Sequence, residues 1–331
     1  LLLMLEPAKK QMSRSQPSPM PKFVEVARLT DPVPITLHEP NVLLLDYAEW
    51  RVGDGAWQPE MEMLRLDNAV RRSLDLPPRG GRIPQPWTDP GDPPILTDVQ
   101  LRFRFRNESP INTPKLAIES TKNLLIRLDG RPVRPRVDGW WVDESIHTIP
   151  LRSLSPGEHE LVLTILFSRK TDLEWCYLLG DFGVRLAGRH ATLTVPLRTL
   201  AWGDWTTQGL PFYAGNVTYH ATLPPGDAGR VIFPKFRNPL LSVQIDRKPA
   251  SRIAFAPFAV PIDASNQERR FDITAFGNRA NAFGCVHHSN EAITWVGPGA
   301  WRSTGTEWQD SYVLKRMGVL AAPIVQDLQI K

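Results

Sequence analysis

Hydrophobic and polar residues alternate along much of this chain, a pattern typical of β-strands with one buried face. The clearest case is residues 99–106, in which Val99, Leu101, Phe103 and Phe105 alternate with one glutamine and three arginines. A period of two places successive side chains on opposite faces of a sheet. We therefore predict a half-buried strand here, with its arginines facing solvent.

Similar short strands are expected throughout the sequence, separated by turns rich in proline and glycine. Apolar or alternating runs occur at residues 42–45, 124–128, 161–165, 192–195 and 217–223. One helix is expected over residues 66–76, where apolar residues recur near helical spacing and Asp67 or Asn68 can cap its start. Many short strands with a single short helix predict an all-β protein of the sandwich class.

Two parts of the chain resemble each other, which indicates an internal duplication. Residues 124–133 and 241–250 both contain an apolar strand, then Asp129 or Asp246, then a basic residue followed by proline. A weaker match relates residues 149–161 to residues 271–283. We therefore expect two tandem jelly-roll sandwiches. The expected segments are a linker or tail over residues 1–38, a first sandwich with a helical insert over 39–188, and a second sandwich over 189–331.

Composition removes several classes of protein from consideration. The 331 residues include 32 prolines and 2 cysteines, which argues against a long-helix protein and against a disulfide-built scaffold. The 39 Lys and Arg nearly balance the 35 Asp and Glu, and the basic residues are dispersed, so no nucleic-acid partner is expected. Apolar runs are far shorter than the roughly 20 residues that cross a membrane. The chain begins with leucine, so we expect it to be a piece of a longer protein or the product of an incomplete gene model.

Several motifs resemble known families of carbohydrate-active proteins. Residues 203–219, which contain Phe-Tyr-Ala-Gly-Asn-Val-Thr-Tyr, resemble the opening strands of the sugar-binding domain of glycoside hydrolase family 2. Residues 278–284 and 308–320 resemble a later strand entry and the closing strand of that domain. Residues 139–143 and 177–184 resemble a galactose-binding-like jelly roll. Tandem domains of this kind are similar to the C-terminal regions of large bacterial α-L-rhamnosidase-like glycoside hydrolases.

This resemblance implies a non-catalytic accessory region that binds carbohydrate or braces a catalytic TIM barrel of the same parent protein. The resembling families place their catalytic carboxylates in that barrel, and this chain shows no alternation of strands and helices. No catalytic residue of the family can therefore be assigned here. Galactose-binding-like folds also imply a structural Ca²⁺, which the sequence does not place, and no other cofactor is expected. The resemblance favours a secreted protein, but the sequence does not determine the cellular compartment.

Tryptophans and nearby polar residues are the candidate sugar-binding groups. A pyranose offers apolar C–H faces to an aromatic ring and hydroxyls to polar side chains. The preferred set, with two further tryptophans, is Asp204, Trp205, Tyr213, His287, Trp202 and Trp301. Trp87 and Trp295 are comparable, and the adjacent Trp140 and Trp141 should point to opposite faces of one strand. The alternative for each tryptophan is packing in a core or between the domains.

Two other functions stay open beside the accessory one. A self-contained glycosidase needs two carboxylates facing one sugar, about 5 to 9.5 Å apart. The carboxylates near aromatic residues or strand ends are Glu174, Asp181, Asp204, Glu291 and Glu307. A structural interaction module without any ligand is the third function. Cys176 and Cys285 are expected to be buried thiols, or else a disulfide between the domains.

Overall fold

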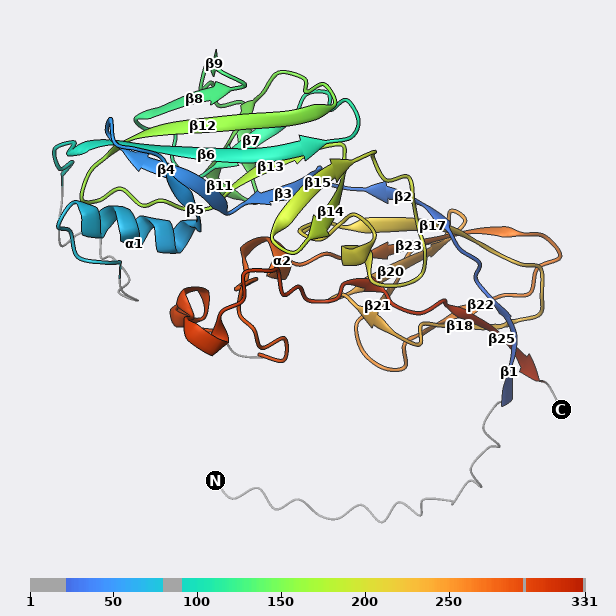
Figure 1. Ribbon diagram of the computed structural model, residues 1–331. Helices are drawn as coiled ribbons and strands as arrows, with labels where there is room; N and C mark the ends of the chain where they lie inside the picture. The colour runs from blue at the N-terminus through green and yellow to red at the C-terminus, as the bar shows by residue number, and fades with distance from the viewer. Residues whose placement is uncertain (1–21, 80–90, 294–295, 330–331) are drawn as a thin grey trace, which may run out of the picture.

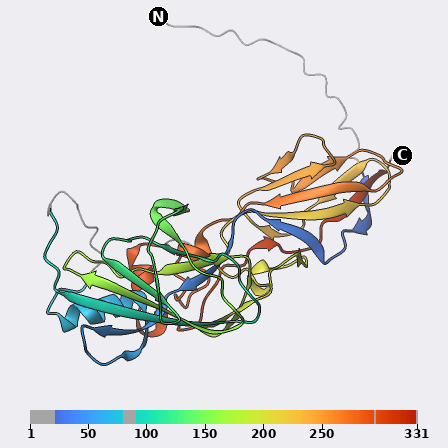
Figure 2. The same cartoon turned by 90° about the horizontal axis from the view of Figure 1, so that it is seen from above.

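Two β-sandwiches lie end to end in the computed structural model, which describes residues 22–79, 91–293 and 296–329 (Figure 1 and Figure 2). The first is built from a five-stranded and an eight-stranded sheet, and the second from a four-stranded and a six-stranded sheet. Each sandwich encloses its own cluster of buried apolar side chains. The all-β sandwich class predicted from the alternating pattern is therefore confirmed.

The first sandwich contains most of the chain between residues 41 and 194. In spatial order, its five-stranded sheet consists of β10 (Gly139–Trp141), β11 (Asp143–Pro150), β7 (Lys115–Ile118), β13 (Cys176–Gly180) and β3 (Asn41–Leu45). Its eight-stranded sheet runs through β14 (Gly183–Ala187), β15 (His190–Thr194), β6 (Thr97–Asn107), β12 (Gly157–Phe167), β8 (Leu124–Leu128) and β9 (Arg131–Val133). Strand β4 (Tyr47–Val52) pairs with β6 and with β5 (Gln58–Glu62).

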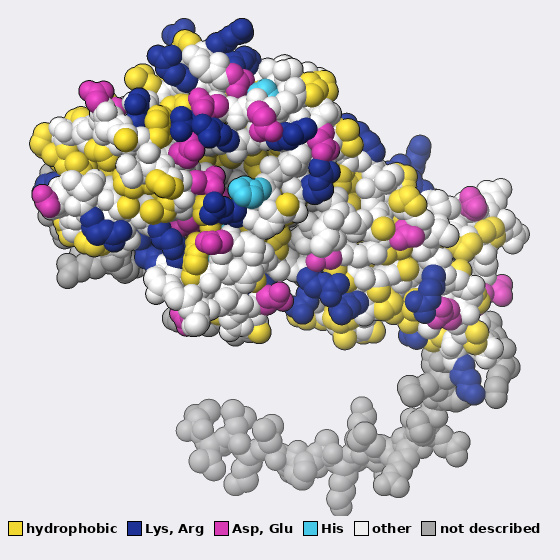
Figure 3. All heavy atoms as spheres, viewed as in Figure 1, with side chains coloured by type: hydrophobic (Ala, Val, Ile, Leu, Met, Phe, Trp, Pro, Cys, Tyr) yellow, Lys and Arg dark blue, Asp and Glu magenta, His cyan; other side chains and the backbone are white. Residues whose placement is uncertain are grey.

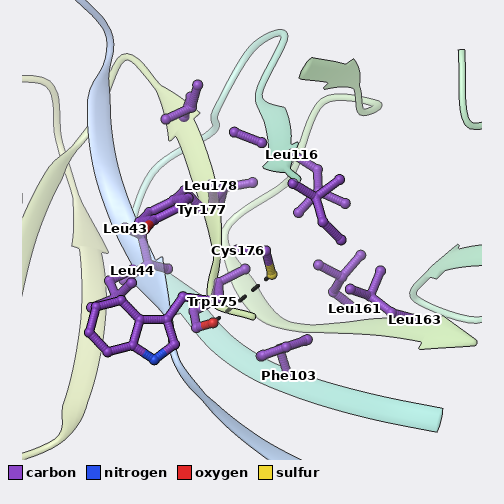
Figure 4. Close-up of a cluster of buried hydrophobic side chains, with 14 of the residues drawn as sticks. Leu43, Leu44, Phe103, Leu116, Leu161, Leu163, Trp175, Cys176, Tyr177 and Leu178 are labelled. Carbon is purple, nitrogen blue, oxygen red and sulfur yellow. Dashed lines mark hydrogen bonds between the residues drawn. The ribbon is translucent and has the colours of Figure 1, made fainter. Parts of the chain in front are cut away.

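Strand β6 has the burial pattern that its sequence predicted. Val99, Leu101, Phe103 and Phe105 are all buried in the first core, whereas the arginines between them face outward. Figure 4 shows Phe103 beside leucines from both sheets and the thiol of Cys176, whose Sγ lies 4.0 Å from the carbonyl oxygen of Leu45. Burial of each large apolar side chain stabilises the fold by about 1.5–3 kcal/mol.

Helix α1 (Met63–Ser73) begins three residues before its predicted start. The carboxylate of Glu62 accepts hydrogen bonds from the backbone N–H groups of Leu64 and Arg65, at 3.2 and 3.3 Å, and so caps the helix. The predicted cap, Asp67, lies inside the helix and pairs with Arg71 one turn later, at 3.0 Å. The cap prediction was wrong because side chains at positions i and i+4 face each other on a helix, and this pairing occupies the carboxylate.

The second sandwich combines the start and the end of the described chain. In spatial order, its four-stranded sheet consists of β1 (Lys22–Arg28), β25 (Ile324–Gln329), β18 (Gly229–Ile232) and β22 (Ala259–Ile262). Its six-stranded sheet consists of β16 (Thr199–Leu200), β2 (Val33–Leu37), β17 (Val217–Leu223), β23 (Arg269–Ala275), β20 (Leu241–Ile245) and β21 (Ser251–Ile253). A small pair joins β19 (Phe236–Arg237) to β24 (Gly318–Val319). The short helical turns are η2 (Trp205–Thr207), α2 (Ala280–Phe283), η3 (Pro298–Arg302) and η4 (Gly305–Glu307).

The two sandwiches share one strand order. The order β6–β12–β8–β9 in the first corresponds to β17–β23–β20–β21 in the second, and β11–β7–β13–β3 corresponds to β22–β18–β25–β1. The Asp129 and Asp246 turns are equivalent, with φ angles of 50° and 51°. Each aspartate exchanges hydrogen bonds with the next strand, through the backbone of Glu160 or of Arg270. The first sequence match therefore joins equivalent hairpins.

The second sequence match is wrong. It equated residues 149–161 with residues 271–283, and so placed β11 opposite β23. The structural counterpart of β23 is β12, because each lies at the centre of its sheet between two equivalent strands. Apolar spacing alone cannot separate β11 from β12, since side chains alternate between two faces with the same period in both strands.

The sandwiches are nested, not tandem. Residues 22–37 were expected to be a linker, but they form β1 and β2, which pair with β25 and with β16 and β17. The first sandwich is therefore inserted between β2 and β16 of the second. Pro34 is compatible with β2 because it lies opposite Thr199 of the two-residue edge strand β16, beyond the residues that β2 pairs with β17.

A long connection from the second sandwich returns to the first. Residues 276–317, here named the returning segment, run between β23 and β24 and lie beneath the first sandwich, beside α1 (Figure 1). Ala282 and Val286 from this segment are buried in the first core. The ring of Phe283 stacks on Trp141 with a centroid distance of 5.4 Å. The first core therefore includes residues far beyond the predicted boundary at 188.

Candidate functional site

The preferred sugar-binding residues of the second sandwich lie in its interior. Trp205 is 0% exposed and Tyr213 is 1% exposed, so neither ring can stack on a sugar at the surface. The Tyr213 hydroxyl donates to the carbonyl oxygen of Asn216 at 2.8 Å and accepts from the backbone N–H of His38 at 3.0 Å. Asp204 caps η2, because its Oδ1 accepts from the backbone N–H of Thr206 at 3.0 Å. Trp205 and Tyr213 belong to the second core, and Tyr213 also binds the backbone of the connection that leads into the first sandwich.

The other three candidates also have internal partners. The Trp202 ring stacks on Tyr219 at 5.3 Å, and its Nε1 donates to the carbonyl oxygen of Leu29 at 2.9 Å. His287 is buried, and its Nε2 lies 2.8 Å from Asp46 Oδ2. Trp301 is half-buried and donates through Nε1 to the carbonyl oxygen of Phe283 at 2.9 Å. For these residues the structure favours core and interdomain packing over ligand binding.

Four other tryptophans complete the comparison with the sequence predictions. Trp87 and Trp295 lie outside the described residues. Trp140 is 57% exposed and Trp141 is 5% exposed, which confirms that adjacent residues on one strand point to opposite faces. Both cysteines are free thiols, with Cys176 buried and Cys285 half-buried.

A cleft between the two sheets of the first sandwich is the strongest candidate site. Its volume is about 620 Å³, and Leu101, Ile118, Leu124 and Leu163 contribute to its apolar wall. Its polar lining includes Glu119, Ser120, Asn123, Ser145, Asp172 and Glu174, which we name the acidic rim. Asp92, Lys122, Ser168, Lys170 and Thr171 also line the cleft. Concave sites with an apolar wall and a few convergent polar groups are typical of ligand pockets. Among these residues, only Glu174 was a candidate from the sequence, as one of the carboxylates near aromatic residues.

The carboxylates of the acidic rim converge on one arginine. Arg79 Nη1 lies 2.8 Å from Glu174 Oε1, and Arg79 Nη2 binds Asp172. Burial raises the pKa of Glu174 and of Asp172 above their usual values, and the Arg79 charge opposes this shift. Burial also raises the pKa of Glu119. Carboxylates with raised pKa values in a cleft are typical of functional sites.

This arrangement is chemically suited to a hydroxyl-rich ligand. Carboxylate oxygens accept hydrogen bonds, serine hydroxyls and the Asn123 amide both donate and accept, and a guanidinium donates. The wall continues outward to Ile95 and Leu166, which are exposed to solvent beside the polar groups. A sugar ring needs such a combination, because its C–H faces are apolar and its edge carries hydroxyls. Only burial and pairing in three dimensions bring these residues together, so local sequence patterns could not select them.

Residues 22–79, 91–293 and 296–329 contain no group of three or more His, Cys, Asp or Glu side chains arranged to bind a metal ion. The Ca²⁺ implied by the resemblance, which backbone carbonyls and an Asp or Asn would hold, stays a prediction. Within the same residues, no helix has the length and apolar character needed to span a membrane. Figure 3 shows basic and acidic side chains interspersed over the viewed face.

Comparisons with known proteins identify no family and no curated relative. No family model matches the chain, and no curated protein matches it. Similar solved structures include a family 2 β-galacturonidase from Eisenbergiella tayi (9% identity, TM-score 0.27) and a β-D-mannosidase from Dictyoglomus thermophilum (14%, 0.27). A rhamnosidase from Novosphingobium sp. PP1Y is similar at 14% identity with a TM-score of 0.29.

These similar structures belong to much longer chains. The alignments cover 73%, 72% and 78% of this chain, but 37%, 31% and 26% of the respective structures. One of the three is described as a family 2 enzyme and another as a rhamnosidase. TM-scores this low establish neither a shared fold nor a shared activity, so the candidate site rests on its own geometry.

Proposed function

We propose that this chain is a non-catalytic accessory region of a larger glycoside hydrolase and that its first sandwich binds carbohydrate in the acidic cleft. The cleft carries this proposal, because it combines an apolar wall with hydroxyl, amide and carboxylate groups. The sequence resemblance to sugar-binding and galactose-binding-like domains supports the same function. The proposed partner of the region is a catalytic barrel in the same parent protein.

The proposal moves the binding site from the second sandwich to the first. The rings of Trp205 and Tyr213 are buried in the second sandwich, so these two residues offer no aromatic surface to a sugar. In the cleft, Glu174 and Asp172 are held by Arg79, and a carboxylate held in this way keeps its remaining lone pairs oriented for a ligand hydroxyl. Each hydrogen bond between a sugar hydroxyl and a charged group contributes about 1.5–3 kcal/mol.

Isothermal titration of the whole chain against a panel of plant and bacterial oligosaccharides tests this function. We expect one sugar class to release heat, and Glu174→Gln to weaken its binding about tenfold or more, through loss of a charge-assisted hydrogen bond. Glu268→Gln is the matched control, because Glu268 is an exposed residue of the second sandwich. Absence of heat with every sugar, or equal losses in the two variants, would refute binding in the cleft.

A self-contained glycosidase is the second candidate, and the raised pKa values of the acidic-rim carboxylates favour it. A carboxyl group with a raised pKa holds its proton to higher pH than an ordinary one, as a general acid requires. Hydrolysis of nitrophenyl glycosides by the purified chain, lost in Glu174→Gln, would support this function. Binding of oligosaccharide without hydrolysis would assign the cleft to recognition alone. If the chain neither binds nor hydrolyses any sugar, it would instead be a structural module without a ligand.

A further inference from the structure

A small basic pocket lies between helix α1 and the returning segment, away from the acidic cleft. Its volume is about 180 Å³, and its lining residues are Leu64, Arg65, Asn68, Arg72, Arg302 and Thr304. Arg65, Asn68 and Arg72 are spaced three and four residues apart, so they share one face of α1. Arg302, at the end of η3, faces them from the other side. The lining therefore carries three guanidinium groups and no carboxylate.

Two of the three arginines have no hydrogen-bond or ion-pair partner among the described residues. The Nη1 atom of Arg302 is buried and makes no hydrogen bond, and the Arg72 side chain makes no hydrogen bond or ion pair to the described residues. The hydroxyl of the adjacent Ser303 is also buried without a partner, in a residue only 6% exposed. An unpaired buried donor on a charged group is costly, and such groups in native proteins usually have an ion or water as partner.

The third arginine is held rigidly in place. Arg65 Nη1 binds Glu62 Oε2 at 2.9 Å, and its Nη2 donates to the carbonyl oxygen of Ser303. Its guanidinium carbon lies 3.2 Å from the centre of the Trp308 ring, a cation–π contact. These contacts satisfy Arg65 and also fix the loop that carries Arg302. The pocket is therefore preorganised, although the charge of Arg302 is not neutralised.

Neighbouring acids do not explain the basic pocket. Glu62 already binds Arg65, and its other oxygen accepts from Trp175 Nε1 at 2.8 Å. Asp67 is buried and paired with Arg71 on another face of the helix. Neither of these two carboxylates is thus available to Arg72 or Arg302. An external anion is the remaining partner that would satisfy both charge and hydrogen bonding.

We propose that this pocket binds a single oxyanion group, with Arg302 and Arg72 as its charged donors and Asn68 and Thr304 as polar neighbours. Arginine suits this role, because its planar fork matches two oxygens of a carboxylate, phosphate or sulfate. The volume accommodates one such group but not an oligosaccharide, in contrast to the cleft. The anion is either a free inorganic ion or the carboxylate of an acidic sugar. This inference is independent of the acidic cleft and of the proposed accessory function.

Titration of the whole chain with inorganic phosphate, glucuronate and glucose distinguishes these sources. Glucuronate differs from glucose by its carboxylate, so binding of glucuronate but not glucose identifies the charged group as the determinant. Phosphate binding without glucuronate binding assigns the pocket to a free tetrahedral anion. We expect Arg302→Gln to weaken binding of the anion about tenfold or more, as the loss of a charge-assisted hydrogen bond implies.

Two further variants separate binding from folding. Arg302→Lys keeps the charge and should retain part of the affinity, whereas Arg247→Gln removes an exposed arginine of the second sandwich and should leave the affinity unchanged. The melting temperature of the unliganded Arg302→Gln chain should equal or exceed that of the wild type, because an unpaired buried charge has been removed. At the same anion concentration, the melting temperature of the wild type and of Arg247→Gln should rise more than that of Arg302→Gln. Failure of phosphate and glucuronate to bind the wild type, or equal binding by Arg302→Gln, would overturn the proposal.

Discussion

The buried pair of Asp46 and His287 connects the returning segment to the first sandwich. His287 Nε2 lies 2.8 Å from Asp46 Oδ2, and the two side chains are 3% and 1% exposed. The other carboxylate oxygen of Asp46 accepts from the Tyr312 hydroxyl at 2.7 Å. The His287 ring also lies 4.7 Å from the ring centre of Trp308. Replacement of this histidine should therefore weaken the attachment of the whole segment.

The contacts of His287 determine how much His287→Ala should lower the free energy of unfolding. Removal of the imidazole leaves a buried carboxylate oxygen of Asp46 without this hydrogen bond, and an unsatisfied buried polar group costs about 1–3 kcal/mol. The lost ring contacts with Trp308 and Tyr312 add about 0.5–1.5 kcal/mol each. These contributions overlap, because they arise from one side chain. We expect the free energy of unfolding to fall by about 3–5 kcal/mol.

The chain contains a matched control for this variant. His220 Nδ1 also lies 2.8 Å from a carboxylate oxygen, Asp272 Oδ1, but these side chains are 29% and 12% exposed. Asp272 keeps a second partner, Arg270, at 2.7 Å. His220→Ala should therefore lower the free energy of unfolding by only about 0–1 kcal/mol.

Urea unfolding of both variants measures the difference, and hydrogen exchange locates it. In His287→Ala, amides of the returning segment should lose protection, whereas those of strands β17 and β23 should retain it. In His220→Ala, protection of the returning segment should be unchanged. Equal losses of stability in the two variants, or undiminished protection of the segment in His287→Ala, would refute the claim that this pair attaches it.

Two other predictions concern packing and pH. Gly277→Ala should lower the free energy of unfolding by about 1–3 kcal/mol, because the new Cβ would collide with the Gly215 carbonyl oxygen. Thermal unfolding measures this loss. Gly299→Ala is the control and should change the stability little, because the space around Gly299 is open. Burial raises the pKa of Glu174 above its ordinary value of 4.5, although the charge of Arg79 opposes this shift. The protonated side chain of Glu174 therefore favours the folded state below pH 4.5, and this contribution to stability is lost as the pH rises through the folded-state pKa. The melting temperature of Glu174→Gln relative to wild type should therefore increase between about pH 4 and pH 7, and a difference independent of pH would contradict this.

Local pattern was sufficient for the individual strands and for one hairpin. The alternation around Phe103 predicted a strand with one buried face, and adjacent Trp140 and Trp141 could only point in opposite directions. The turns at Asp129 and Asp246 were recognisable as copies, because a strand, a turn residue that tolerates positive φ and a return strand are neighbours in sequence. These features depend on interactions within a few residues, which the sequence displays directly.

Strand partners, the nesting of the sandwiches and the position of the cleft depended on tertiary structure. Thr36 of β2 pairs with Thr218 of β17 across an inserted sandwich, and no local pattern reports a partner that distant. Burial likewise decided between the two roles open to each tryptophan: a ring such as that of Trp205 suits a sugar or a core equally well, and only its surroundings make it part of the core. The alternation of residues therefore determined the β class of this protein, whereas long-range pairing decided which surfaces remain free to bind a ligand.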